Sequence, residues 1–228
     1  MISFLMMEMN RNIRQHFFDT GLMWLTRPRL ESEQLRKLTP EFMLSLDYFL
    51  ENREEFLALE RLYGNAVRNG VLASFGIASV DKDIGLGLFA AEPLKREDFV
   101  GEYTGIVREA REIDADEIDA AGHYPDDWAW DYPVDIPGLP PLEIDAATEG
   151  NPLRYVNHSL FPNLRPDHFL LDGVWVIIFV ADRDIERGEE LTIDYGDAYW
   201  SDGFRELVLR EGELEKLGLR DHIDHMES

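Results

Sequence analysis

The first seventy residues have the hydrophobic pattern of α-helices, with apolar residues recurring three or four positions apart. The clearest series is Phe42, Leu46, Phe49, Leu50, Phe56, Leu59 and Leu62. Thr39 is suited to cap this helix, with Pro40 at its first position and Gly64-Asn65 at its end. Residues 1–70 are therefore predicted to form an N-terminal helical region.

Shorter helices are predicted over Ile2–Leu25 and Glu33–Leu38, interrupted at Arg27-Pro28 because proline disrupts a helix. Two roles remain open for this region. It can be a packing module that covers one side of the main domain, or a module that recruits a substrate or partner. The same helices are also candidates for a homodimer contact.

From about residue 71 the pattern changes to short apolar runs bounded by Gly, Pro and Asp, which is typical of short strands in small sheets. The runs are Val71–Ser79, Leu86–Ala91, Asp98–Tyr103, Phe169–Leu171, Val174–Ala181 and Glu190–Tyr195. Val174–Ala181 is the most apolar run and is predicted to be a central strand buried on both faces. Strands and helices do not alternate, so a doubly wound sheet is not expected. The fold class is α+β with a mainly β core.

Residues 71–202 are predicted to form the main domain, and residues 203–228 a C-terminal helix and tail. Within the last segment, Phe204–Leu217 has the pattern of an amphipathic helix. The residues after Arg220 are expected to be loose, as chain ends often are.

The chain is strongly acidic: 22 Lys and Arg stand against 46 Asp and Glu, which gives a formal charge of −24 at pH 7. This charge disfavours direct binding to nucleic acid and favours a basic partner, although it can also serve solubility alone. An acidic insert over residues 106–145 includes Trp128, Trp130 and Tyr132. Carboxylates interleaved with aromatic rings suit a groove for a cationic peptide, and the alternative is a solvated face.

The chain has no cysteine, which excludes disulfides and zinc sites built on thiolates. No apolar run of about 18 residues occurs, so no transmembrane helix is expected. The apolar stretch Met1–Met9 lacks a basic region and contains Glu8, so we do not predict a secretory signal. We expect a soluble protein of the cytoplasm or nucleus.

Chemistry-bearing residues are concentrated in Arg154–Asn163, where amides, an imidazole and a hydroxyl stand beside aromatic residues and a proline. This mixture suits a rigid backbone whose polar groups face a ligand. On an extended backbone Asn157 and His158 point to opposite sides. Taken alone, Gly85-Leu86-Gly87 indicates only a turn, and Tyr195 a strand-end aromatic residue in the core.

Four segments, in their order along the chain, resemble the SET-domain family of protein lysine methyltransferases. They are Gly85–Ala90, Phe99–Gly105, Ile144–Asn163 with its Arg-Tyr-Val-Asn-His-Ser stretch, and Gly188–Trp200 with its Gly-Glu-Glu-Leu-Thr-Ile-Asp-Tyr-Gly-Asp stretch. The resemblance covers about residues 76–202. It implies the SET-domain β-clip fold of small curved sheets, in which the Asn-His segment passes under a loop formed by the last motif, giving a pseudoknot.

The resemblance also implies S-adenosylmethionine as the methyl donor, no metal, and a basic protein substrate such as a histone tail. It assigns Tyr195 and Tyr103 to catalysis. It assigns to cofactor binding the residues Gly85, Leu86, Gly87, Arg154, Asn157, His158 and Trp130. It assigns to the substrate side Ile193, Trp200, Phe204 and Trp128. The alternative is a catalytically silent SET-like module that binds peptides or partners.

This chain departs from the family at Leu160, where many members have a zinc-binding cysteine. The N-terminal helices and the segment from Tyr199 onward must then close the fold and the lysine channel. A compact, cysteine-free member is compatible with bacterial origin, and a secreted bacterial effector would act in the host nucleus. A metal-dependent hydrolase is disfavoured because no His-x-x-x-His spacing occurs.

The second departure, at Ile193, predicts the degree of methylation. The family often has Phe or Tyr at this position, two residues before the catalytic tyrosine, and isoleucine has no hydroxyl to hold a water. We therefore expect di- or trimethylated lysine as product. Mass spectrometry of long reactions checks this expectation, and monomethyl-lysine as the sole end product would contradict it.

Overall fold

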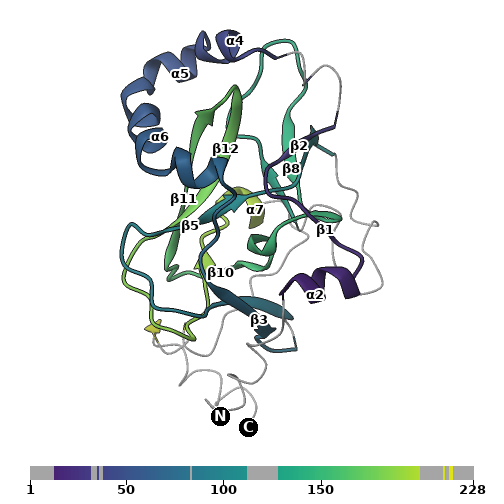
Figure 1. Ribbon diagram of the computed structural model, residues 1–228, viewed down its shortest axis with the longest axis vertical. Coiled ribbons are helices and arrows are strands. Elements are labelled where there is room, and N and C mark those ends of the chain that lie inside the picture. Colours follow the sequence, from purple (N-terminus) through teal and green to yellow (C-terminus); the bar gives the residue numbers. More distant parts are fainter. Residues whose placement is uncertain are drawn as a thin grey trace.

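The computed structural model describes residues 13–31, 35, 38–82, 84–111, 128–200, 213 and 216–217, and the structural statements below concern these residues. Their strands form five small sheets of two to four strands each (Figure 1). Small sheets with few helices confirm the prediction of an α+β fold with a mainly β core. The predictions on residues 203–228 lie outside the described residues, apart from Glu213, Lys216 and Leu217.

The three-stranded antiparallel sheet has β12 (Val174–Ala181) in its centre, between β11 (Leu164–Leu171) and β5 (Phe99–Tyr103). Every residue of β12 after Val174 is buried, so the prediction of a central strand buried on both faces is confirmed. A tight turn at Asp172-Gly173, where both residues have positive φ, joins β11 to β12.

The four-stranded sheet has the order β2, β6, β8, β7. Its strands are β2 (Arg29–Leu30), β6 (Ile106–Glu109), β8 (Leu142–Asp145) and β7 (Ala129–Asp131). One guanidinium is buried between β6 and β8: Nη2 of Arg108 lies 2.7 Å from a carboxylate oxygen of Glu143 and 2.9 Å from one of Asp145. Its charge is thus compensated inside the sheet.

Three two-stranded sheets complete the β core. In the antiparallel one, β3 (Phe75–Ser79) pairs with β4 (Leu86–Ala90). The parallel pairs are β1 (Met23–Trp24) with β9 (Glu149–Gly150), and β10 (Asn157–His158) with β13 (Thr192–Ile193). A 3₁₀ turn, η1 (Pro152–Tyr155), precedes β10, and α7 (Asp197–Trp200) follows β13.

The N-terminal helices are α2 (Ile13–Asp19), α4 (Pro40–Leu44), α5 (Asp47–Glu51) and α6 (Arg53–Arg68). The predicted cap is confirmed, because the Phe42 amide donates to Oγ1 of Thr39 at 3.2 Å. The predicted stop at Gly64-Asn65 is wrong: α6 continues to Arg68. Gly64 lies inside the helix because it faces Leu171 of β11, where an added Cβ would approach the leucine to 3.4 Å.

The helix α6 lies beside the three-stranded sheet (Figure 1). Together with α5 it packs on this sheet through an aromatic cluster. Phe56 lies edge-on to the buried Trp175, with ring centroids 5.1 Å apart, and Phe49 stacks on Phe56 at 6.0 Å. The Tyr48 hydroxyl and Nε2 of His168, on β11, form a hydrogen bond of 2.6 Å. This part of the N-terminal region therefore completes the core of the main domain.

The segment after α2 is extended, although the pattern predicted a helix as far as Leu25. Met23–Trp24 and Arg29–Leu30 instead form β1 and β2, because β9 and β6 offer unpaired backbone groups to them. A bidentate ion pair from Arg29 to Glu149, with both distances 2.8 Å, holds the same segment.

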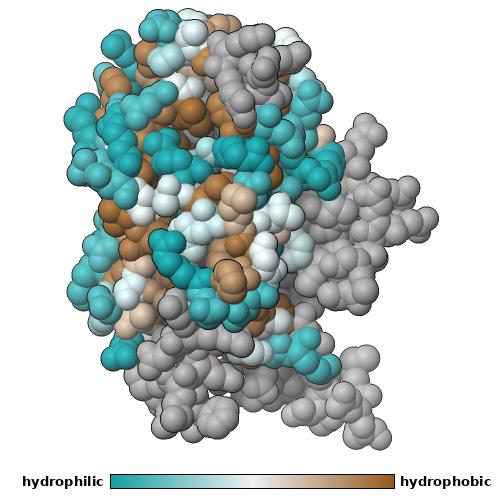
Figure 2. Space-filling view, turned by 45° about the vertical axis from the view of Figure 1, so that its right-hand side comes forward, coloured by the Kyte–Doolittle hydropathy of each residue, from teal (hydrophilic) through white to brown (hydrophobic). Residues whose placement is uncertain are grey.

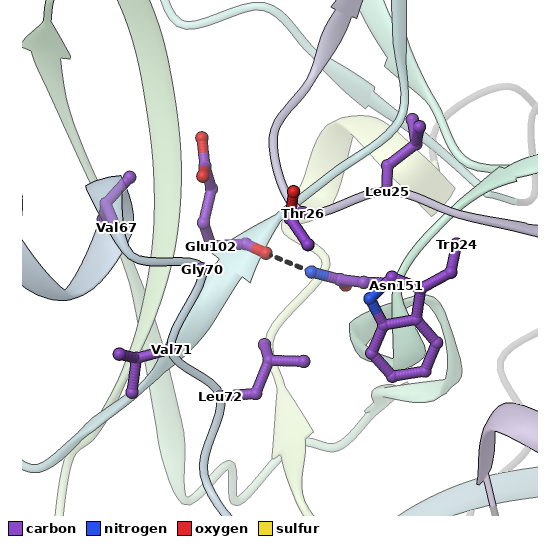
Figure 3. A pocket seen from close by; sticks show the side chains of 9 residues that line it. All are labelled: Trp24, Leu25, Thr26, Val67, Gly70, Val71, Leu72, Glu102 and Asn151. Carbon is purple, nitrogen blue, oxygen red and sulfur yellow. Dashed lines mark hydrogen bonds between the residues drawn. The ribbon is translucent and has the colours of Figure 1, made fainter.

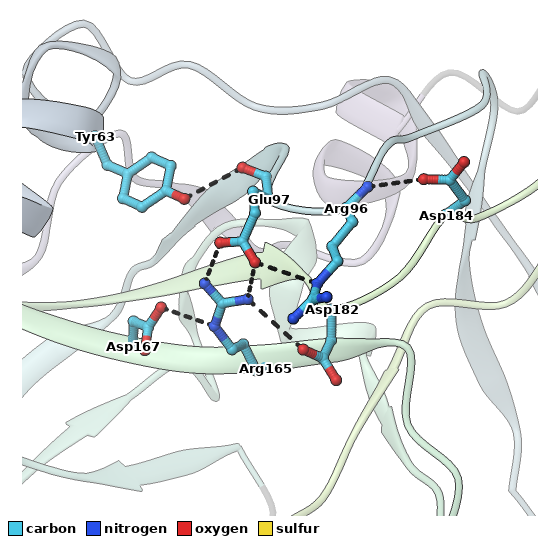
Figure 4. Close-up of polar contacts among 7 residues, drawn as sticks. All are labelled: Tyr63, Arg96, Glu97, Arg165, Asp167, Asp182 and Asp184. Atoms are coloured by element: carbon cyan, nitrogen blue, oxygen red, sulfur yellow. Dashed lines mark hydrogen bonds and ion pairs between the residues drawn. The ribbon is translucent and has the colours of Figure 1, made fainter.

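A network of charged side chains ties the loop before β5 to β11 (Figure 4). Arg165 donates to both carboxylate oxygens of Glu97, at 3.0 and 2.6 Å, and to Asp167 at 3.2 Å. Glu97 has φ +72°, an uncommon backbone conformation for a residue other than glycine. The Tyr63 hydroxyl donates to the Glu97 carbonyl at 3.2 Å, so α6 also holds this loop.

On the face shown in Figure 2, apolar and polar residues alternate without one continuous apolar field. Large apolar side chains with more than half of their area exposed are found on several helices, for example Phe18, Leu50 and Leu62. No helix in the described part of the chain combines the length and apolar character needed to span a lipid bilayer.

Glu102 is buried beside a small cavity where the N-terminal segment, the end of α6 and β5 meet (Figure 3). The cavity measures about 10 Å³, room for about one water molecule. Arg27 lies 3.1 Å from the carboxylate, but without the geometry of a hydrogen bond. Burial therefore dominates over the attraction to Arg27 and raises the pKa of Glu102 to about 8.

This shift predicts a pH dependence of stability. The folded chain retains a proton on Glu102 between pH 4.5, the ordinary pKa of the carboxyl, and about 8, so its contribution to stability is lost as the pH rises through this window. Glu102→Gln lacks this titration. The melting temperature of the variant should therefore rise relative to that of the native chain between pH 5 and pH 8.

The matched control is Glu109→Gln, an identical chemical change on the exposed end of β6. Its melting temperature should follow the pH profile of the native chain. Parallel profiles for Glu102→Gln and the native chain would show that Glu102 does not titrate in this window.

Candidate functional site

The candidate site forms where β10 pairs with β13, which brings together two motifs that lie more than thirty residues apart. Asn157 is opposite Thr192, and His158 is opposite Ile193. The Ser159 amide extends the pairing by donating to the Ile193 carbonyl at 2.9 Å. These are the two segments that a pseudoknot requires to meet.

Tyr195 crosses from the second motif back to the first. Its hydroxyl donates to the Val156 carbonyl at 2.9 Å, and its amide donates to Nδ1 of His158 at 3.2 Å. The His158 ring also lies against Tyr195 and Trp200, with ring centroids 5.5 and 4.9 Å away. The phenol of Tyr195 is thus fixed next to the backbone of Asn157.

The glycine-containing segment reaches the same place through Asn157. Nδ2 of Asn157 donates to the Leu86 carbonyl at 3.1 Å and to Oε1 of Glu190 at 3.0 Å. Gly87 has no room for a side chain, because an added Cβ would lie 2.8 Å from Oε1 of Glu190 and 3.1 Å from Nδ2 of Asn157. Gly85 has φ +81°, which favours glycine, and an added Cβ would point into open space.

Arg154 brings a half-buried cation to this region. Its guanidinium lies over the rings of Trp128 and Tyr155, 4.8 and 5.2 Å from the ring centroids, and Nη2 donates to the Ala147 carbonyl at 3.1 Å. Its Nε is buried and has no hydrogen-bond partner among the described residues. Burial lowers the pKa of Arg154 below its ordinary value, which the nearby phenols oppose.

Tyr103 is buried in an aromatic wall. Its hydroxyl donates to the Trp128 carbonyl, and its ring lies 5.8 Å from that of Trp130 and 5.9 Å from that of Phe179. Burial raises the pKa of Tyr103 far above its ordinary value, and the phenol of Tyr195 adds to the rise. Tyr103 is therefore neutral and lies within electrostatic range of Tyr195.

The remaining predicted residues differ in their surroundings. Trp200 stacks on Tyr195 at 6.3 Å with nearly parallel rings, whereas Ile193 is buried in the core with 1% of its surface exposed. Phe204 lies outside the described residues. The structure thus brings Tyr195, Asn157 and Trp200 to one place, and their roles stay predictions.

Two residues at this place had no assigned role. Glu190 accepts from the Asn157 amide, and Tyr199 lies edge-on to Tyr195 with ring centroids 4.7 Å apart. Both stand inside the motif Gly188–Trp200, so their position was visible in the sequence. The direction of their side chains was not, because it depends on contacts with Asn157 and Tyr195 in the folded chain.

In the described ranges, no group of three or more His, Cys, Asp or Glu side chains is arranged to hold a metal ion. The ionisable residues near Asn157 are instead hydrogen-bonded to protein groups, as for Glu190, or separated by aromatic rings, as for Arg154.

Comparison with known proteins relates part of the chain to a protein family. The SET-domain model matches residues 85–196, just under half of the chain, and these residues contain both paired strands, β10 and β13, and Tyr195. Over these residues the chain is similar to the SET-domain family, and they include the central strand β12 described above. This confirms the resemblance drawn from the motifs.

Curated relatives match over the same part of the chain. Histone-lysine N-methyltransferase EZH2 of Chaetomium thermophilum is 35% identical over 115 residues, which are 50% of this chain and 8% of that protein. Histone-lysine N-methyltransferase MEDEA of Arabidopsis thaliana is 36% identical over 123 residues, 52% of this chain and 17% of that protein. The matches thus span less than a fifth of either relative.

A solved structure matches over most of the chain. ATXR5, in complex with histone H3.1 mono-methylated on R26, aligns with a TM-score of 0.54 over 85% of this chain and 89% of that chain, at 19% identity. At this identity the likeness concerns the fold alone.

Proposed function

We propose that this chain is an S-adenosylmethionine-dependent protein lysine methyltransferase that acts on a basic protein such as a histone. The observation that carries the proposal is the convergence at β10. There the Asn157 amide reaches the glycine segment, and the Tyr195 hydroxyl is held on the Val156 carbonyl. The names of the relatives, all histone-lysine N-methyltransferases, support the same activity.

The described residues fit the methyl donor. A buried guanidinium nitrogen without a hydrogen-bond partner, Nε of Arg154, suits the carboxylate of the donor. The backbone at Gly85 is open to a ligand, because no atom lies within 4 Å of an added Cβ. We assign the donor to the space between this segment, Asn157 and Trp200.

When bound, S-adenosylmethionine supplies an electrophilic methyl group that a neutral amine can take up in an in-line displacement. A free lysine side chain has a pKa of about 10.4 and is charged at neutral pH. The aromatic rings of Tyr103, Tyr195 and Tyr199 would desolvate the amine and lower its pKa. Tyr195, held by Val156 and His158, would orient the amine, since positioning contributes several kcal/mol to catalysis.

The expected substrate is basic because the chain carries a formal charge of −24. Acidic surface attracts lysine-rich peptides over a distance of about 10 Å at moderate salt and so raises the association rate. ATXR5, which shares the fold, was solved in complex with histone H3.1 mono-methylated on R26. A histone tail therefore fits both the charge and the relatives.

The first test is methyl transfer by Tyr195→Phe. Loss of the hydroxyl should lower transfer of labelled methyl groups to histones by about 100-fold, the usual effect of removing one positioned polar group from a site. It should cost about 1 kcal/mol of stability, because one hydrogen bond to the Val156 carbonyl is lost.

Tyr63→Phe is the matched control, since its hydroxyl also donates to a backbone carbonyl, that of Glu97, outside the site. It should lose similar stability and retain methyl transfer. A native chain that binds histone peptides but transfers no methyl group would instead establish the alternative, a silent SET-like binding module.

The second test concerns substrate charge. Between 50 and 300 mM NaCl, kcat/KM for a lysine-rich histone peptide should fall several-fold, because salt screens the attraction to the acidic chain. A neutral peptide with one lysine should show a weaker dependence. Equal turnover of both peptides at all salt concentrations would remove the basis for a basic substrate.

A further inference from the structure

The turn Ser159–Asn163 directly follows the two-residue strand β10 and is held at both of its ends. At one end the Ser159 amide donates to the Ile193 carbonyl, and at the other the Asn163 side chain donates to the Glu190 carbonyl at 2.7 Å. Between these anchors Leu160 and Phe161 are about 40% exposed. The outer side of the turn therefore needs another contact to define its conformation.

Glu213 supplies this contact from a position 54 residues further along the chain. Its Oε1 accepts a hydrogen bond from the Ser159 hydroxyl at 2.6 Å and from the Leu160 amide at 2.9 Å. Both Glu213 and Ser159 are buried, with 5% and 6% of their surfaces exposed. Because both hydrogen bonds converge on one buried oxygen, Glu213 fixes the positions of both donors.

The Ser159 hydroxyl completes the arrangement because it also accepts from the Phe161 amide at 3.0 Å. Glu213 thus orders two successive amides of the turn, one directly and one through Ser159. A second contact comes from the next helical turn: Nζ of Lys216 lies 4.6 Å from the centre of the Phe161 ring, and the Leu217 amide donates to the Glu213 carbonyl.

The position of the turn matters because Ser159 is the neighbour of His158. His158 accepts from the Tyr195 amide, and its ring packs against Trp200. A parallel pair of only two residues per strand has little stability of its own. A shift of Ser159 would therefore move His158 and Asn157 relative to Tyr195.

We propose that Glu213 is a positioning residue of the SET site: its carboxylate holds the Ser159–Leu160 turn and thereby keeps Asn157 and His158 in place for the methyl donor. The C-terminal part of the chain would then control donor affinity without touching the donor. The effect on the donor rests on the proposed function, whereas the effect on the turn does not.

Two variants of Glu213 test whether an acceptor oxygen is needed at this position. Glu213→Ala removes the acceptor, and Glu213→Gln retains an oxygen that can accept from Ser159 and Leu160. The dissociation constant for S-adenosylhomocysteine, measured by calorimetry on the full chain, should rise about 10-fold in Glu213→Ala and stay within about 3-fold of the native value in Glu213→Gln. The control Tyr63→Phe should lose stability without a change in this constant.

Ser159→Ala provides the second arm of the experiment. It is a smaller change, and it keeps the test available if Glu213→Ala does not fold. If Glu213 acts through Ser159, the two effects on the dissociation constant are not additive, and the double variant binds nearly as well as Glu213→Ala. Additive effects, or native affinity in a folded Glu213→Ala or Ser159→Ala, would overturn the proposal.

Hydrogen exchange distinguishes failure of this inference from failure of the proposed function. In Glu213→Ala, peptides covering residues 156–161 and 190–196 should exchange faster, whether or not the chain binds a donor. In Glu213→Gln they should keep most of their protection. Unchanged exchange in Glu213→Ala would show that the carboxylate does not hold the turn. If Glu213→Ala exchanges faster but the native chain does not bind S-adenosylhomocysteine, only the proposed methyl donor is disproved.

Discussion

The pairing of Asn157–His158 with Thr192–Ile193 is the interaction on which the site depends. Because two paired residues on each strand contribute few hydrogen bonds, side chains reinforce the contact. The Thr192 amide donates to Oδ1 of Asn163, and Nδ2 of Asn163 donates to the Glu190 carbonyl. An asparagine is suited to this role because one amide group both accepts and donates.

Residues outside the SET-domain match supply part of the core on which this contact rests. Phe49 and Phe56 cover Trp175 of the central strand, and β1 and β2 pair with β9 and β6. Without these contacts, two strand edges and a large buried aromatic side chain would face water. Most buried apolar residues in the described part of the chain thus belong to one shared core.

Buried acidic side chains in this core avoid an uncompensated charge in two ways. Arg108 compensates Glu143 and Asp145 within the four-stranded sheet, whereas burial raises the pKa of Glu102, on the strand that carries Tyr103, to about 8. Buried pairs of this kind add little net stability, because desolvation offsets most of the attraction. They favour one arrangement of the strands, since any other arrangement would leave a buried charge uncompensated.

The sequence by itself determined what depends on neighbouring residues: the Thr39 cap, the buried strand Val174–Ala181, and the order of motifs that revealed the SET domain. It could not determine that α6 passes through Gly64, or that Met23–Trp24 is a strand, because Leu171 and β9 decide these points. The meeting of the Tyr195 hydroxyl with the Val156 carbonyl was likewise decided only by the tertiary structure. Hydrogen bonds between distant segments leave no local pattern, since each partner is an ordinary polar group until the chain folds.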